Sequence, residues 1–96
     1  MNRAKILGRL SRNFDQIEGR FSVKALSLFG SAARDEHGKG DIDVLVEFAG
    51  APTFDLYMDL KFFLETLCDA SVDLVTVDAV KPRMWPLIER SLINVA

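Results

Sequence analysis

The chain has 96 residues, of which 49% are apolar and 27% are charged, and its formal net charge is −2. This length suits a single domain, residues 1–96, with one modest core near the lower limit for independent stability. Because there is no basic excess, nucleic acid is not expected as a partner. A lone cysteine allows no internal disulfide, and we find neither a membrane-spanning run nor a signal peptide, so we expect a cytoplasmic protein.

The first elements are a helix and a short strand. The helix is predicted over residues 3–19 and is expected to end at Gly19. Its apolar stripe consists of Ile6, Leu10, Phe14 (or Asn13) and Ile17. Residues 23–29 alternate as a strand, and Gly30-Ser31 then begins a helical turn for which Ser31 is the expected N-cap.

The remaining pattern completes a small α/β arrangement. It gives, in chain order, a loop at 36–40, a strand at 41–48, a helix at 54–70, a strand at 71–77 and a last helix from about Met84. Pro86 must lie in the first turn of that helix, where its missing N–H does no harm. The order α-β-α-β-α-β-α predicts an α/β (α+β) fold with a small, mixed, three-stranded sheet flanked by helices.

Two acids open the strand at 41–48. Asp41 and Asp43 share one face of the strand, while Ile42 and Val44 lie on the apolar face that should pack in the core. Carboxylates about 6.5–7 Å apart along a strand can converge on a cation, which relieves their mutual repulsion. Oxygen ligands of this kind suit Mg²⁺. Taken alone, the two acids are also compatible with a solvated strand edge or a turn.

A third acid and a glycine-serine pair strengthen the case for a phosphate site. Asp73 interrupts an apolar strand, where an acid requires either a partner or an exposed position. If its strand lies beside the strand at 41–48, three carboxylates could hold two Mg²⁺ ions for phosphoryl chemistry. At Gly30 a phosphate can approach the backbone closely, and Ser31 adds a hydroxyl donor.

These motifs together resemble the minimal nucleotidyltransferases (MNT) of the DNA polymerase β superfamily. The pattern is Gly-Ser, then Asp-Ile-Asp ten positions after the serine, then Val-Asp-Leu-Val. The likeness covers nearly the whole chain, through LSLFGSAARDEHGKGDIDVLVEF, a helix, VDLVTVDAVKP and a short terminal helix. It is similar to the MntA-type antitoxins that are encoded beside HEPN-domain toxins, and it implies the nucleotidyltransferase fold.

The resemblance also implies roles for individual residues. Asp41, Asp43 and Asp73 would be the catalytic acids and metal ligands, with Asp73 as the base for the attacking hydroxyl. Gly30 and Ser31 would bind the nucleotide. The implied reaction transfers AMP from ATP to a tyrosine of a HEPN-type toxin, which makes a hetero-oligomer the expected assembly.

The chain departs from the family pattern at two positions. Members usually have Gly where this chain has Asp35, and Ser where it has Gly40. Neither position is a metal ligand, although loop geometry and phosphate contacts could differ.

Two functions remain open at this point. The chain could be an enzyme, or an antitoxin that neutralises its toxin by contact while its active site is inactive. The intact set of acids favours the enzyme, because paired acids are costly in a merely structural domain. A polymerase or tRNA-adding enzyme is disfavoured by the absence of basic excess and of a further nucleic-acid-binding domain. A core of 96 residues has little material to close over ATP, so the partner, or a second copy in a homodimer, is expected to complete the site.

Other chemically notable residues have simpler interpretations. Arg34 could contact phosphate, but a structural ion pair with an acid such as Asp41 is favoured. His37 is interpreted as a solvated loop residue and Cys68 as a small core residue. Trp85 is expected to pack the last helix onto the sheet, although an exposed Trp85 would suit a partner surface.

Overall fold

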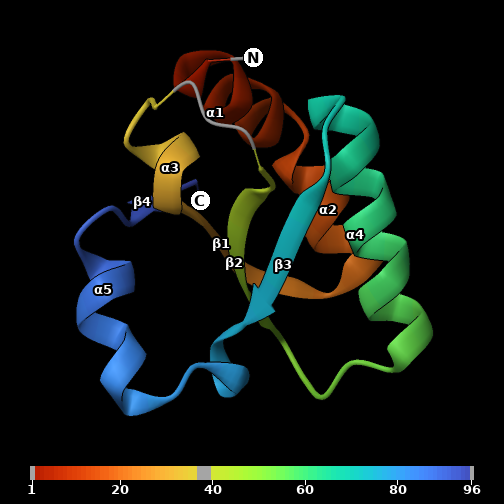
Figure 1. Ribbon diagram of the computed structural model, residues 1–96. Helices are drawn as coiled ribbons and strands as arrows, with labels where there is room; N and C mark the ends of the chain where they lie inside the picture. Colours follow the sequence, from red (N-terminus) through yellow and green to blue (C-terminus); the bar gives the residue numbers. More distant parts are fainter. Residues whose placement is uncertain (1, 37–39, 96) are drawn as a thin grey trace.

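The computed structural model of the chain describes residues 2–36 and 40–95, and Figure 1 shows its arrangement. Its elements in chain order are α1 (Arg3–Arg12), α2 (Phe14–Phe21), β1 (Val23–Phe29), α3 (Gly30–Ala33), β2 (Ile42–Phe48), α4 (Phe54–Cys68), β3 (Val72–Thr76), the 3-10 turns η1 (Val77–Ala79) and η2 (Pro82–Met84), α5 (Trp85–Glu89) and β4 (Ile93–Asn94). The described elements confirm a mixed α/β fold.

The strands form one mixed sheet in the order β3-β2-β1-β4. β1 is antiparallel to β2, and β2 is parallel to β3. The expected count of three strands was too low, because β4 adds Asn94 and Ile93 beside Ser27 and Leu28. A two-residue strand shows no alternation in a sequence, which is why the pattern could not reveal it.

Two helices, α1 and α2, replace the single helix expected over residues 3–19. The helix is interrupted at Asn13, whose side-chain amide donates to the carbonyl oxygen of Arg9 at 2.7 Å. This bond offers the last turn of α1 an alternative to continuing the helix. The predicted stop at Gly19 was wrong, since α2 continues past it and ends before Ser22, which has a left-handed backbone with φ of 55°.

The turn after β1 begins at Gly30 as predicted, but Ser31 is not its N-cap. Phe29 holds the cap position with an extended backbone, and Ser31 lies within the first turn. The strand runs directly into the helical turn, so the cap falls on the last strand residue whatever its side chain. The prediction for Pro86 is confirmed, because it lies in the first turn of α5.

The main core lies between the sheet and the helices α1, α2 and α4, which gather on one side of it (Figure 1). Its buried members are Ile6, Leu10, Ile17, Phe21, Val23, Leu26, Leu28, Ala33, Ile42, Val44, Val46, Leu60, Leu64, Cys68, Val72 and Leu74. The predicted stripe of the first helix therefore faces this core, with Phe14 packed at its margin. Cys68 is a small buried core residue, as interpreted from the sequence.

The two faces of β2 are those predicted from its alternation. Ile42, Val44 and Val46 are buried in the main core, whereas Asp43 is half-buried on the opposite face. Leu45 shares the face of Asp43 and is also buried, although it lies outside the main core cluster. The acidic face of the sheet is therefore partly sheltered from solvent.

Candidate active site

The pairing of β2 with β3 brings two of the predicted acids together. In the parallel register Asp43 lies opposite Asp73, so the two side chains come from adjacent strands at the same level of the sheet. Neighbouring strands are about 4.8 Å apart, which brings side chains on one face into contact range. Asp41 is exposed and directly precedes β2, two residues before Asp43. The sheet thus places all three acids at one end, with Asp43 in the middle.

Gly30 lies against the central acid because β1 and β2 are neighbours. Phe29 is the register partner of Asp43, and Gly30 follows it with φ of 73°. A Cβ atom built on Gly30 would stand 2.1 Å from the Oδ2 atom of Asp43, where no side chain could fit. Glycine is therefore required here for two reasons, its backbone conformation and the space that the carboxylate occupies.

The electrostatics of the acids reflect their crowding. The pKa of Asp43 is raised, chiefly by burial, then by the charges of Asp73 and Asp41 and by a hydrogen bond with the Asp73 side chain. The positive charge of Arg34 opposes this shift. Two carboxyl groups can share a hydrogen bond only if one of them carries a proton. A cation bound between them would relieve the repulsion of two ionised carboxylates.

The donor set fits a hard cation in chemical type, because the three groups at this end are all carboxylates. Over residues 2–36 and 40–95, however, no three acidic, histidine or cysteine side chains are already arranged to hold an ion. The inner pair, Asp43 and Asp73, is in place. Asp41 is exposed, so its side chain is free to turn toward the pair.

A cleft of about 390 Å³ lies beside the acids, between α1, α3 and the start of β2. Its lining includes Ser31 and Asp41, together with Arg3 and Asp35, but neither Asp43 nor Asp73. The predicted residues thus fall into two adjoining groups. Gly30 and the paired acids lie over the sheet, and Ser31 and Asp41 border the cleft.

Sequence reasoning missed one contact with the site, which involves Ser91. The amide N–H of Gly30 donates to the Oγ atom of Ser91 at 2.9 Å. α5 ends at Glu89, so Ser91 lies in the segment that leads to β4. The two residues are 61 positions apart, and no motif links them.

Three further residues singled out in the sequence are Arg34, Trp85 and His37. Arg34 forms an ion pair with Glu36 at 2.9 Å, so its acidic partner is not Asp41. Trp85 is half-buried at the start of α5, while the neighbouring Met84 is 42% exposed. His37 lies outside the described residues.

Comparison with known proteins identifies the family. The profile of the nucleotidyltransferase domain matches residues 5–94. A Methanocaldococcus jannaschii protein, provisionally named protein adenylyltransferase MJ0128, is 40% identical over 81 residues, which cover 82% of this chain and 83% of that protein. Protein adenylyltransferase MntA of Thermococcus cleftensis is 30% identical over 87 residues, covering 90% of this chain and 88% of its own. The chain therefore belongs to the nucleotidyltransferase domain family, and its relatives in this comparison are named protein adenylyltransferases.

Solved structures confirm the fold. A protein described as a minimal nucleotidyltransferase superposes with a TM-score of 0.80 at 29% identity, covering 97% of this chain and 95% of its own. An MNT antitoxin structure, solved in complex with a tri-AMPylated HEPN toxin of Shewanella oneidensis, gives a TM-score of 0.67 at 17% identity and covers 94% of this chain and 71% of its own. The resemblance to minimal nucleotidyltransferases is thus confirmed.

None of the helices in residues 2–36 and 40–95 has both the length and the apolar character that crossing a membrane requires.

Proposed function

We propose that this chain transfers AMP from ATP to a hydroxyl group of a partner protein, with Mg²⁺ bound by Asp41, Asp43 and Asp73. The observation that carries the proposal is the side-by-side register of Asp43 and Asp73, with Gly30 packed directly against Asp43. That arrangement combines a carboxylate cluster with a stretch of backbone that a phosphate can approach.

The residues divide the work of the reaction. Gly30 and Ser31 hold the triphosphate so that its α-phosphorus faces the acids. Asp73 accepts the proton of the attacking hydroxyl at a carboxylate oxygen, while the new oxygen–phosphorus bond forms and the bond to pyrophosphate breaks. Bound Mg²⁺ would supply charge stabilisation for the phosphate oxygens. Arg34 adds positive charge close to Asp43 and so favours the ionised form that binds a cation.

The acceptor is proposed to be a tyrosine of a HEPN-type toxin. The resemblance to MntA-type antitoxins suggests it, and relatives are named protein adenylyltransferases. A solved complex of the same fold is described as holding a tri-AMPylated HEPN toxin, and another as a toxin–antitoxin with AMP-PNP. The chain's own single tyrosine, Tyr57, donates its hydroxyl hydrogen to the carbonyl oxygen of Leu74, which argues against self-modification. Since ATP is the substrate, we place the reaction in the cytoplasm.

Intact-mass spectrometry tests the proposal directly. The purified chain is incubated with Mg-ATP and a HEPN-type toxin encoded beside it, and the toxin should gain the mass of one or more AMP units. Asp43→Ala and Asp73→Ala should abolish the gain. Asp78→Ala is the matched control, because Asp78 is an exposed acid in η1, just after β3, and should leave the transfer unchanged.

The competing function is neutralisation by contact alone. It would be favoured if the wild-type chain protected its target without any mass gain and if Asp43→Ala protected equally well. Tandem mass spectrometry of the modified toxin then locates the acceptor, and a modified serine or threonine would overturn the tyrosine assignment while leaving the transfer itself intact.

A further inference from the structure

We infer that Arg3 and Asp35 form a clasp that positions the nucleotide-binding turn α3 against helix α1. The main-chain N–H of Arg3 donates to the Oδ1 atom of Asp35 at 3.0 Å. The guanidinium of the same residue donates to the carbonyl oxygen of Ala33, the last residue of α3, at 3.1 Å. Two bonds from one residue therefore join the start of α1 to the end of the turn that contains Ser31.

The clasp gives Asp35 a reason to adopt an unfavourable backbone. Its φ of 60° lies in the left-handed region, which aspartate tolerates less readily than glycine. Glycine would relieve the backbone strain but has no carboxylate to bond Arg3. The hydrogen bond from Arg3 therefore offsets the strain at Asp35. The first turn of α1 has no acidic residue of its own, and Asp35 places a negative charge at this positive end of the helix.

The position of the clasp connects it with the candidate site. Arg3, Asp35, Ser31 and Asp41 all line the same cleft of about 390 Å³. Ala33 is buried in the main core, so the far end of α3 is fixed by packing as well as by the bond from Arg3. Loosening the clasp should therefore change where Ser31 lies relative to the acids. This consequence for nucleotide binding rests on the proposed function.

Four substitutions separate the contact from the strain. Asp35→Ala removes the acceptor and keeps the strain, whereas Asp35→Gly removes both. Asp35→Asn keeps an acceptor oxygen and tolerates the left-handed backbone, so it should rescue the clasp. Arg3→Ala removes only the bond to Ala33. With Mg-ATP, we expect Asp35→Gly and Arg3→Ala to raise the KM for ATP about 3- to 10-fold, the loss of about one hydrogen bond, with little change in kcat.

Matched controls come from the same chain. Ser22 follows α2 with φ of 55°, is exposed and lies outside the cleft that Arg3 and Asp35 line, so Ser22→Gly relieves the same kind of strain. It should raise the melting temperature and leave the KM for ATP unchanged. Asp35→Gly should give no such gain in melting temperature, because the lost contact offsets the relieved strain. Arg12→Ala, an exposed arginine at the end of α1, is the control for Arg3→Ala.

Hydrogen exchange tests the clasp without any nucleotide. The amides of Arg34, Asp35 and Glu36 donate within the turn, and they should exchange about 3- to 10-fold faster in Asp35→Gly and Arg3→Ala than in the wild type. Unchanged exchange would overturn the clasp itself. Faster exchange with an unchanged KM would overturn its role in positioning the nucleotide. If ATP is not used at all, the proposed function fails, while the exchange result still decides whether the clasp exists.

Discussion

Asp43 is the residue on which opposing requirements meet. The proposed metal binding requires an ionised Asp43, yet burial and the charges of its neighbours raise the pKa of this residue. The folded protein therefore binds a proton at Asp43 more tightly than the unfolded chain does. The stabilisation from this group is complete below the unfolded pKa of about 3.9 and is lost as the pH rises through the raised folded value.

This imbalance predicts the effect of Asp43→Asn on stability. At pH 7 the neutral, equally sized side chain should raise the melting temperature of the metal-free protein while abolishing AMP transfer. The difference from the wild type should shrink as the pH is lowered, because the wild-type carboxyl then takes up its proton. Thermal scans between pH 4 and 8 measure it, with the exposed Asp41→Asn as the control of smaller effect. A destabilised Asp43→Asn variant at pH 7 would contradict this account.

At the residue scale, sequence patterns predicted types of contact better than partners. The alternation of residues in β2 predicted that Asp43 lies on the face of the sheet away from the main core, because backbone geometry fixes the two-residue period of a strand. The juxtaposition of Asp43 and Asp73 could be anticipated only on the condition that their strands were neighbours. The bonds of Ser91 to Gly30 and of Asp35 to Arg3 join distant segments, and no local pattern encodes them.

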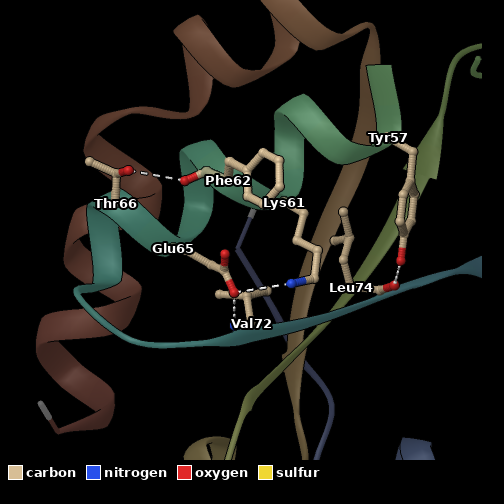
Figure 2. A network of polar contacts seen from close by, with 7 residues as sticks. All are labelled: Tyr57, Lys61, Phe62, Glu65, Thr66, Val72 and Leu74. Carbon is tan, nitrogen blue, oxygen red and sulfur yellow. Dashed lines mark hydrogen bonds and ion pairs between the residues drawn. The ribbon is translucent and has the colours of Figure 1, made fainter. Parts of the chain in front are cut away.

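At the scale of elements, α4 is joined to the outer strand β3 by a row of polar side chains. Figure 2 shows Tyr57, Lys61 and Glu65 directed from α4 toward β3. One carboxylate oxygen of Glu65 accepts from the N–H of Val72 at 2.9 Å and from Lys61 at 3.1 Å, and the hydroxyl of Tyr57 donates to Leu74. These bonds satisfy backbone groups that a further strand would otherwise pair.

Substitutions in this row should show that the backbone bond matters more than the ion pair. Lys61→Ala removes a partly exposed ion pair and a cation–π contact with Phe62 at 6.0 Å. Glu65→Ala removes the same ion pair and also leaves the N–H of Val72 unpaired, so Glu65→Ala should be the more destabilising. The pKa of Glu65 is lowered, chiefly by the Val72 amide. Its stabilisation is therefore present above the unfolded pKa and lost as the pH falls through the lowered value.

Urea unfolding at several pH values measures these differences. The gap between wild type and Glu65→Ala should narrow as the solution is acidified through the range where Glu65 protonates. Equal effects of Lys61→Ala and Glu65→Ala at pH 7 would assign the stability to the ion pair instead.

The long elements were the predictable ones. Helical spacing predicted α4 and the apolar stripe of α1 and α2, because a period of 3.6 residues persists over several turns. The interruption at Asn13 coincides with a side-chain bond to Arg9, which the spacing of apolar residues does not encode. β4 is stabilised by its pairing with β1 rather than by its own sequence.

For the whole molecule, ligand binding should be visible as added stability. If Mg²⁺ relieves the repulsion among the acids, Mg-ATP should raise the melting temperature, by an amount that reflects about 2.7 kcal/mol at a concentration 100 times the dissociation constant. ATP without Mg²⁺ should have a much smaller effect. Differential scanning fluorimetry measures both, with the Asp41→Ala, Asp43→Ala double variant as the control. No shift at saturating Mg-ATP would favour neutralisation by contact.

The covered edge of β3 also has a consequence for how this chain can associate with other proteins. An exposed strand edge invites an incoming strand to extend the sheet, in functional complexes as well as in aggregates. At β3 such a strand would have to displace Glu65 from Val72 and Tyr57 from Leu74. At the other end the terminal strand has only two residues, too few to template a stable addition. We therefore expect a bound protein to meet this chain through side chains, with the sheet remaining closed to intermolecular pairing.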